Sequence, residues 1–315
     1  MFKHRHLHST MSSPFKNILI VGATGSIGGI MLDALVKEPS FNVTALQRSS
    51  SKGKLPSNVR VITIDDSYPS EALVSAFSGQ DAIINCMTSL AVSDQLRFVD
   101  AAVDAKVRRY VASEYGLNNN RPEARALNSV FREKGEVQDY LRSKESTGLE
   151  WMAIACGMWI KWSALHDFLG MHIKEKKFVV WDDGEGWFST TTEDNTALAM
   201  VNALTKKWED TKNKIVWLSE FAITQNMLLE AIEHLSGEKF TIEKVNTDEL
   251  IKEKQAAVAS GDPYAVYSLI ETGFVTGRFG GHLEKEGQIM NGVLGLPKKN
   301  LDEVVKAALK AVSES

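Results

Sequence analysis

The residue pattern with the clearest chemistry is a glycine-rich loop near the start of the chain. The run NILIVGATGSIGG spaces three glycines evenly between an apolar stretch and an apolar helical pattern. Gly22 permits a tight turn after a strand, Gly25 lets the backbone approach a pyrophosphate, and Gly28 lets the helix pack closely. The helix N-terminus then offers free N–H groups to the anion. We therefore predict dinucleotide binding rather than a purely structural turn. The loop residues expected to contact the cofactor are Gly22, Thr24, Gly25, Ser26, Ile27 and Gly28.

The end of the second predicted strand selects between the two nicotinamide cofactors. An NAD-preferring site places Asp or Glu here, where it bonds the ribose 2′-hydroxyl. This chain has Arg48 instead, followed by Lys52 and Lys54 with no acid between them. A guanidinium can bind a 2′-phosphate with two donors. The segment therefore favours NADPH, and the alternative interpretation is a solvated basic loop.

Two further motifs follow, Ser113-Glu114-Tyr115-Gly116 and Phe131-x-x-Lys134. With these motifs, the glycine loop and Arg48, the chain resembles the isoflavone reductase-like and NmrA-like branch of the short-chain dehydrogenases/reductases, which has S-E-F-G at the first of them. The segment WLSEFAITQNMLLEAIEHLSGEKFTIEKV follows in the same order, so the resemblance runs from about Lys16 to the end. It implies an NADPH-dependent reductase that delivers hydride to an aromatic or conjugated small molecule. The NmrA-like members imply an alternative, a non-catalytic NADP(H)-sensing regulator that binds a protein partner.

Two lysines compete for the catalytic role. Tyr140 and Lys144 have the Y-x-x-x-K spacing of the wider superfamily, which places both side chains on one helix face. Gly148 ends that helical pattern four residues after Lys144 but fourteen residues after Lys134. A catalytic lysine needs the helix to continue well beyond it, so we favour Lys134 as proton donor or relay and as a contact to the cofactor. Val130 stands four residues before Lys134, so no tyrosine partners it, as in the isoflavone reductase-like branch.

Other residues are assigned to the cofactor and the substrate by their position. Ligands lie at the carboxyl ends of strands in such sheets, which places Met87 and Thr88 beside the nicotinamide. Ser113 is expected to hydrogen-bond cofactor or substrate. After the sixth strand the family pattern is replaced by CGMWIKW, which leaves the substrate open. Aromatic side chains can stack a planar ring, although each can equally serve the core. The aromatic candidates are Trp159, Trp162, Trp181 and Phe274, with Trp187 and Phe188 also considered.

The elements that must position these residues follow from the hydrophobic pattern. Nearly continuous apolar runs alternate with helical patterns up to residue 156, which indicates a parallel sheet covered on both faces. Strands are predicted at 17–21, 41–46, 59–64, 81–86, 109–111 and 151–155, with helices starting near residues 27, 70, 93 and 122. Later strands are predicted at 177–181 and 187–191, as a hairpin or two short strands, and at 215–218 and 240–245. Later helices are predicted at 193–204, 223–235, 247–259 and 301–312.

These elements predict a Rossmann-type, doubly wound α/β fold with a smaller α+β part. Residues 1–15 are expected to be a disordered extension, and residues 16–156 an NADP(H)-binding domain. Residues 157–315 are expected to form the substrate-binding part, which can interleave with the first.

Composition narrows the classes of function. The chain has 315 residues, 43% of them hydrophobic and 24% charged, as in folded globular proteins. Its net charge of −4 argues against a nucleic-acid binder, and no apolar run approaches the roughly 20 residues of a membrane span. Cys86 and Cys156 stand in apolar runs and are interpreted as buried thiols in a reducing compartment. We expect a cytoplasmic oxidoreductase with no metal site, and the sequence leaves its oligomeric state open.

Overall fold

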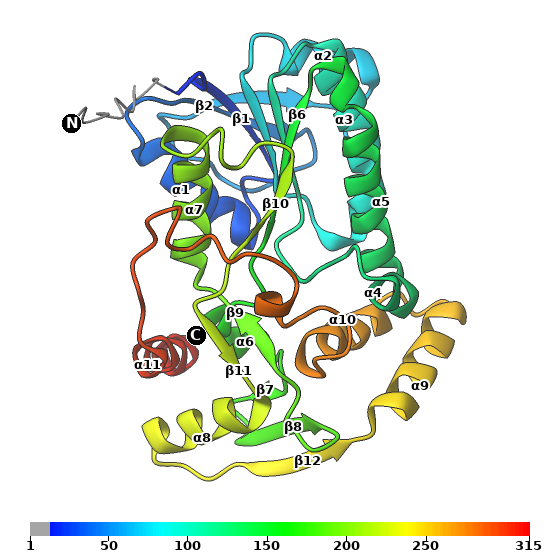
Figure 1. Cartoon of the computed structure of the whole chain (residues 1–315), viewed down its shortest axis with the longest axis vertical. Coiled ribbons are helices and arrows are strands. Elements are labelled where there is room, and N and C mark those ends of the chain that lie inside the picture. Colours follow the sequence, from blue (N-terminus) through cyan, green and yellow to red (C-terminus); the bar gives the residue numbers. More distant parts are fainter. Residues whose placement is uncertain (1–12) are drawn as a thin grey trace, which may run out of the picture.

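A seven-stranded parallel sheet forms the centre of the computed structural model, which describes residues 13–315 (Figure 1). Its strands are β1 (Asn17–Val21), β2 (Asn42–Arg48), β3 (Arg60–Ile64), β4 (Ala82–Asn85), β5 (Arg109–Ala112), β6 (Glu150–Ala155) and β10 (Lys214–Trp217). They follow the order β10-β6-β5-β4-β1-β2-β3, so the strand order reverses beside β1. Ligands bind at such a reversal, in the crevice outside the carboxyl ends of the strands.

Apolar residues of the strands supply two separate cores, one on each face of the sheet. Ile18 and Ile20 of β1 belong to one core, whereas Leu19 and Val21 belong to the other. Successive side chains of a strand point to opposite faces, so a sheet covered on both sides needs apolar residues throughout. The first core is covered by α1 (Ser26–Lys37) and α7 (Glu193–Thr205), and the second by α2 (Ser70–Phe77), α3 (Gln95–Asp104) and α5 (Ser129–Ser143). The predicted doubly wound α/β fold is confirmed.

The start of α5 is fixed by a helix cap. The Asn128 side chain accepts a hydrogen bond from the backbone N–H of Phe131 at 2.9 Å, which satisfies one free donor of the first turn. The short helix α4 (Pro122–Leu127) precedes it and begins with a proline, whose fixed φ suits a first helical position. Together they place Lys134 in the second turn of α5, near the carboxyl end of the sheet.

The smaller part is built from short strands and helices below the sheet (Figure 1). Strand β8 (Lys177–Trp181) lies between β7 (Met171–His172) and β12 (Thr241–Val245), and β9 (Phe188–Thr190) pairs with β11 (Phe221–Ile223). Residues 177–181 and 187–191 are therefore two short strands and not a hairpin, because both edges of β8 are already occupied. The helices of this part are α6 (Ile160–Leu165), α8 (Gln225–Ser236), α9 (Thr247–Ala259), α10 (Ala265–Val275) and α11 (Leu301–Glu314).

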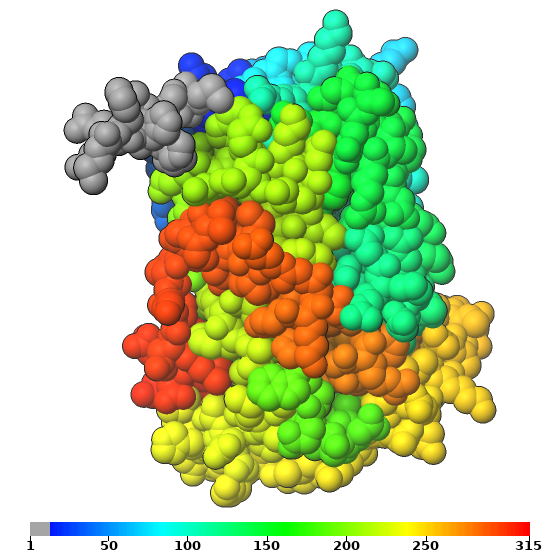
Figure 2. All heavy atoms as spheres, in the orientation of Figure 1, coloured from blue at the N-terminus to red at the C-terminus, as the bar shows by residue number. Residues whose placement is uncertain are grey.

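The two parts of the chain interleave. Strand β10 pairs with β6 in the main sheet, and α7 covers one face of that sheet, although both lie after residue 157. Figure 2 shows the C-terminal segment, coloured orange to red, lying across the front of the molecule. This segment is tied to the sheet part by the Asn202 amide, which donates to the Leu294 carbonyl at 2.8 Å.

The N-terminal end of the described chain packs against the sheet part. Phe15 is buried against Trp208, and the Ser13 hydroxyl donates to the Leu204 carbonyl. The expectation of disorder is wrong for residues 13–15, because they are packed. The remaining residues of the expected extension lie outside those that the structure describes.

Candidate functional site

The glycine loop lies at the reversal of strand order and leaves no room for side chains. Gly22 has a φ of +79°, and a Cβ there would lie 2.5 Å from the Cys86 carbonyl oxygen. A Cβ on Gly28 would lie 2.0 Å from the Gly22 carbonyl oxygen. Gly25 precedes the first turn of α1, and no side chain caps that turn. The backbone N–H groups of the first turn of α1 are thus free to bind an anion such as a pyrophosphate.

One cavity of about 270 Å³ lies between this loop and the carboxyl ends of β2, β3 and β4, and we call it the adenosine cavity. It includes Arg48, as predicted from the sequence, together with Asp66, which the sequence reasoning missed. The Arg48 Nη1 atom lies 3.9 Å from the Asp66 Oδ2 atom. Lys52 and Lys54 are exposed and do not line this cavity, so Arg48 is its one cationic side chain among the described residues.

A second cavity of about 360 Å³ adjoins the first, and we call it the substrate cavity. The two share lining residues at the glycine loop and at the end of β4, namely Gly25, Cys86, Met87 and Thr88. The substrate cavity is mainly apolar and reaches the α5 face and the smaller part. The site residues predicted from the sequence that line it are Gly25, Ser26, Ile27, Met87, Thr88, Ser113, Lys134, Trp159, Trp162 and Phe274.

Lys134 lies in the wall of the substrate cavity with its ammonium group almost fully buried. Its Nζ atom donates to the Glu114 carbonyl oxygen at 2.5 Å. Burial lowers the pKa of Lys134, and the negative charge of Glu114 opposes this change. Gly135 allows α5 to approach closely, because a Cβ there would lie 2.5 Å from the Asn119 carbonyl oxygen. The Lys134 ammonium group is thus held by a backbone carbonyl, and its lowered pKa makes it release a proton more easily.

The Glu114 carboxyl group is buried in the same wall. It accepts a hydrogen bond from the Asn119 amide and lies beside Gln138. Burial raises the pKa of Glu114, while the Lys134 charge and these hydrogen bonds counteract the rise. Glu114 belongs to the Ser113-Glu114-Tyr115-Gly116 motif, but its residue type alone predicted no role for it. The wall therefore holds a buried acid and a buried base, a combination found at reactive sites.

Three further polar groups line the cavity near the ends of β4 and β5. The Ser113 hydroxyl donates to the Met87 carbonyl at 2.8 Å, which joins the two strand ends. The Tyr115 hydroxyl lies 3.4 Å from the Cys86 sulfur. Burial raises the pKa of Cys86 to about 12 and that of Tyr115 well above its ordinary value. Both groups are neutral at physiological pH, whereas the pKa of Lys134 is lowered and that of Glu114 is raised by burial in the same wall.

Aromatic side chains form much of the remaining wall. The Trp159 indole N–H donates to the Thr196 hydroxyl at 3.1 Å, which fixes the ring. Trp162 stacks on His166 with ring centroids 4.3 Å apart, and Phe274 packs edge-on against Phe131 at 6.2 Å. Rings that are held in place offer flat apolar surfaces to a planar ligand.

Three aromatic candidates lie elsewhere. Trp181 is buried in the core and does not line the cavity. Its indole N–H donates to the hydroxyl of Thr272 on α10 at 2.9 Å. Trp187 is 43% exposed and stacks on His282, and Phe188 is fully buried in β9. The expectation for Trp181 is corrected accordingly, because an apolar strand residue here serves the core.

Several wall residues of the substrate cavity were not predicted, and three of them lie in the smaller part of the chain. Phe168 follows α6, and Tyr267 and Ile270 lie on α10. Neither helix was predicted, and no motif marks these segments. A signal existed only in the apolar spacing of residues 266, 269, 270 and 274, which is helical.

Tyr140 and Lys144 lie outside both cavities. The Tyr140 hydroxyl and the Lys144 ammonium group both contact Asp100, at 2.6 and 2.8 Å. Helix α5 ends at Ser143, so Lys144 stands at its C-cap. The two residues of the Y-x-x-x-K motif therefore join the end of α5 to Asp100 of α3, Lys144 by an ion pair and Tyr140 by a hydrogen bond, away from the glycine loop.

Within residues 13–315, no three His, Cys, Asp or Glu side chains are grouped so as to hold a metal ion. No helix in this range combines the length and the apolar character needed to cross a bilayer.

A glycine loop at the reversal of a parallel sheet, next to a deep apolar cavity, defines a Rossmann-type dinucleotide-binding protein. The sequence model of the NmrA-like family matches residues 14–282, and the chain belongs to this family.

Similar proteins are reductases and oxidoreductases. The chain is 32% identical to the oxidoreductase aprR of Aspergillus flavus over 93% of its own length and 98% of that protein. It is 27% identical to the isoflavone reductase of Pisum sativum over 76% of its length and 82% of that protein. The binary complex of leucoanthocyanidin reductase with NADPH from Vitis vinifera has a similar fold, with a TM-score of 0.73 and 17% identity. That comparison covers 93% of this chain and 99% of the other.

Proposed function

We propose that this protein is an NADPH-dependent reductase that transfers hydride to an aromatic or conjugated small molecule. One observation carries the proposal: a buried lysine, Lys134, lies in the wall of an apolar cavity that adjoins the glycine loop. A reductase needs a cofactor site, a dry place for the acceptor and a proton donor, and the glycine loop, the apolar cavity and Lys134 would supply them.

The residues of the loop and the adenosine cavity fit NADPH. The glycines leave a cradle that side chains would fill, the first turn of α1 is uncapped, and Arg48 is available for a 2′-phosphate. When bound, NADPH supplies the hydride. A protein of similar fold, leucoanthocyanidin reductase of Vitis vinifera, was solved in complex with NADPH, which supports this choice.

The cavity residues then determine what is reduced. Trp159, Trp162 and Phe274 offer apolar ring surfaces, and a cavity of about 360 Å³ suits a ligand of drug-like size. Lys134 can supply or relay the proton that balances hydride addition, because burial makes its ammonium group a stronger acid than an exposed lysine. The apolar walls exclude water, which strengthens the effect of that charge on a developing oxyanion.

The test measures NADPH consumption with a panel of aromatic enones, quinones and benzylic ethers. The Lys134→Met variant keeps the volume of the side chain and removes its ionisable group. We expect it to lower kcat about 100-fold or more, the usual contribution of a positioned acid or base, with NADPH affinity changed only slightly. The matched control is Lys144→Met at the C-cap of the same helix, which should keep full activity.

Two outcomes would contradict the proposal in different ways. Full activity of the Lys134→Met variant would exclude the lysine as proton donor. Tight NADPH binding without turnover of any acceptor, together with a protein partner released by NADPH, would favour the NADP(H)-sensing regulator instead.

A further inference from the structure

We propose that Asp66 limits the cofactor selectivity of this protein, because its carboxylate engages Arg48 and repels the 2′-phosphate of NADPH. The protein then binds NADPH only modestly more tightly than NADH. This inference rests on the proposed function, since it concerns the cofactor assigned there.

The sheet itself places Asp66 beside Arg48. Arg48 ends β2, and its partner in the parallel register is Ile64, the last residue of β3. The Ser49 N–H donates to the Ile64 carbonyl at 2.8 Å and extends the pairing by one residue. The chain therefore reaches Asp66 two residues beyond the partner of Arg48, and the two side chains lie 3.9 Å apart.

Hydrogen bonds hold the Asp66 carboxylate in this position. Its oxygens accept from the Ser49 hydroxyl at 2.9 Å, from the Ser50 N–H at 3.0 Å and from the Ser50 hydroxyl. These hydrogen bonds from Ser50 and Ser49, together with Arg48, hold the pKa of Asp66 below its ordinary value. The group is ionised at neutral pH and cannot turn away without breaking these bonds.

The acids that line the adenosine cavity reduce the preference of Arg48 for a phosphate over a neutral ribose hydroxyl. Among the lining residues Arg48 is the one cation, while Asp66 and Asp94 are acids, and Asp94 is paired with Arg97. A 2′-phosphate must share the guanidinium with Asp66 and lie near its negative charge. A ribose 2′-hydroxyl can instead donate to a carboxylate, as it does in NAD sites.

The experiment compares cofactor binding in the full-length protein and three variants. Asp66→Asn removes the charge but keeps an oxygen for the Ser49 and Ser50 donors. Asp65→Asn is the matched control, since this neighbouring acid does not line the cavity. Ser50→Ala removes a hydrogen bond to Asp66 and leaves its charge. Dissociation constants for NADPH and NADH are measured by titration of cofactor fluorescence at about 0.02 M and about 0.3 M salt.

We expect Asp66→Asn to tighten NADPH binding about three- to tenfold at low salt, because both side chains are partly exposed and the repulsion is screened. NADH binding should stay the same or weaken, so the selectivity for NADPH increases. The gain should shrink at high salt, and neither control should reproduce it.

Unchanged or weaker NADPH binding in Asp66→Asn would overturn the inference, and so would an equal gain in Ser50→Ala, which would assign the effect to the loop. These results would leave the proposed function intact. Failure of the wild-type protein to bind either cofactor would overturn the proposed function as well.

Discussion

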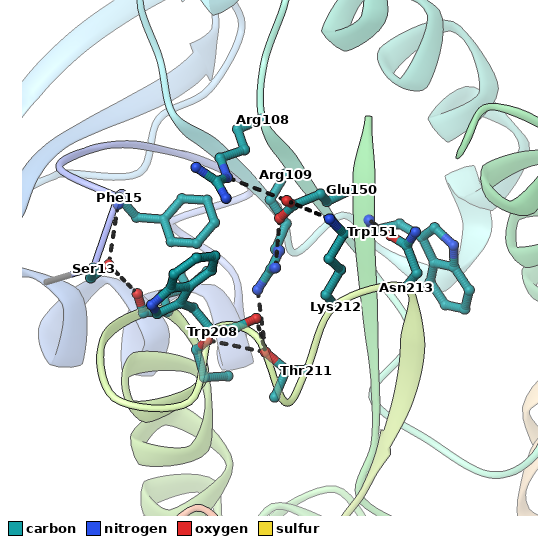
Figure 3. A network of polar contacts seen from close by, with 12 residues as sticks. Ser13, Phe15, Arg108, Arg109, Glu150, Trp151, Trp208, Thr211, Lys212 and Asn213 are labelled. Carbon is teal, nitrogen blue, oxygen red and sulfur yellow. Dashed lines mark hydrogen bonds and ion pairs between the residues drawn. The ribbon is translucent and has the colours of Figure 1, made fainter. Parts of the chain in front are cut away.

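The substitution Glu150→Gln tests the polar network that joins the sheet to the segment after α7 (Figure 3). The Glu150 carboxylate contacts three cations: Arg109 at 2.6 Å, Lys212 at 3.2 Å and Arg108 at 3.3 Å. The Arg109 side chain is fully buried. Its Nη2 atom contacts Glu150, and its Nη1 atom donates to the Thr211 hydroxyl at 3.2 Å. Loss of the carboxylate would leave a guanidinium inside the protein without a counter-charge.

The magnitude follows from the burial of each contact. Removing one partner of a buried pair costs about 3–5 kcal/mol, and the Arg109–Glu150 pair qualifies because both groups are buried. Arg108 and Lys212 are exposed, so each contact contributes less than about 1 kcal/mol. The amide of the variant can still accept one hydrogen bond, which returns about 1 kcal/mol. We expect the free energy of unfolding to fall by about 3 kcal/mol.

The assay is urea unfolding followed by circular dichroism, with linear extrapolation to water. The control Glu175→Gln affects an exposed contact to Lys177 and should change stability by less than about 0.5 kcal/mol. Burial alone would raise the pKa of Glu150, but the three cations more than offset this and leave it below its ordinary value of 4.5. The stabilising contribution is therefore present above about pH 4.5 and is lost as the pH falls below it. A loss of less than about 1 kcal/mol, or a difference from wild type that does not shrink in acid, would refute this reasoning.

Two further substitutions probe the glycine loop and a carboxyl group of the smaller part. Gly28→Ala places a methyl group 2.0 Å from the Gly22 carbonyl oxygen and should weaken NADPH binding about tenfold or more. The control is Gly29→Ala, whose added methyl group would lie 3.8 Å from its nearest neighbour, and it should bind NADPH normally in calorimetric titration. Equal NADPH affinities of the two variants would contradict the role of close packing at Gly28. Glu271 has a pKa raised to about 8, because burial outweighs the hydrogen bonds it accepts from backbone N–H groups, including that of Gly170. Wild type loses the stabilising contribution of the protonated carboxyl as the pH rises from about 5 through about 8, whereas the glutamine does not titrate. Glu271→Gln should therefore gain about 3–4 kcal/mol of stability relative to wild type over this range in urea unfolding. A pH-independent difference would show that the carboxyl group titrates normally.

The parts of the site that the sequence predicted are those where the backbone dictates the residue. The glycines of the loop are required because no side chain fits between Gly28 and Gly22, and that requirement appears directly as a motif. Lys134 was preferred to Lys144 from the expected helix length, and the structure places only Lys134 in a cavity. Both predictions depend on local geometry.

The rest depends on contacts between distant segments, which spacing does not encode. Phe168 and Tyr267 reach the substrate cavity only because the smaller part folds against the end of the sheet that carries the glycine loop. Trp181 and Trp159 are the same residue type in apolar segments, yet Trp159 lines the substrate cavity and Trp181 packs in the core. Asp66 acquires its role from the pairing of β2 with β3, which brings it beside Arg48.

Transfer of deuterium from NADPH into a product tests the proposed reductase activity most directly. NADPH deuterated on one or the other face of its hydride-donating carbon is incubated with the acceptor panel, and products are examined by mass spectrometry. We expect one deuterium in the product from one labelled face only, and incorporation about 100-fold slower with the Lys134→Met variant. Binding of NADPH with no deuterium in any product would contradict hydride transfer by this protein.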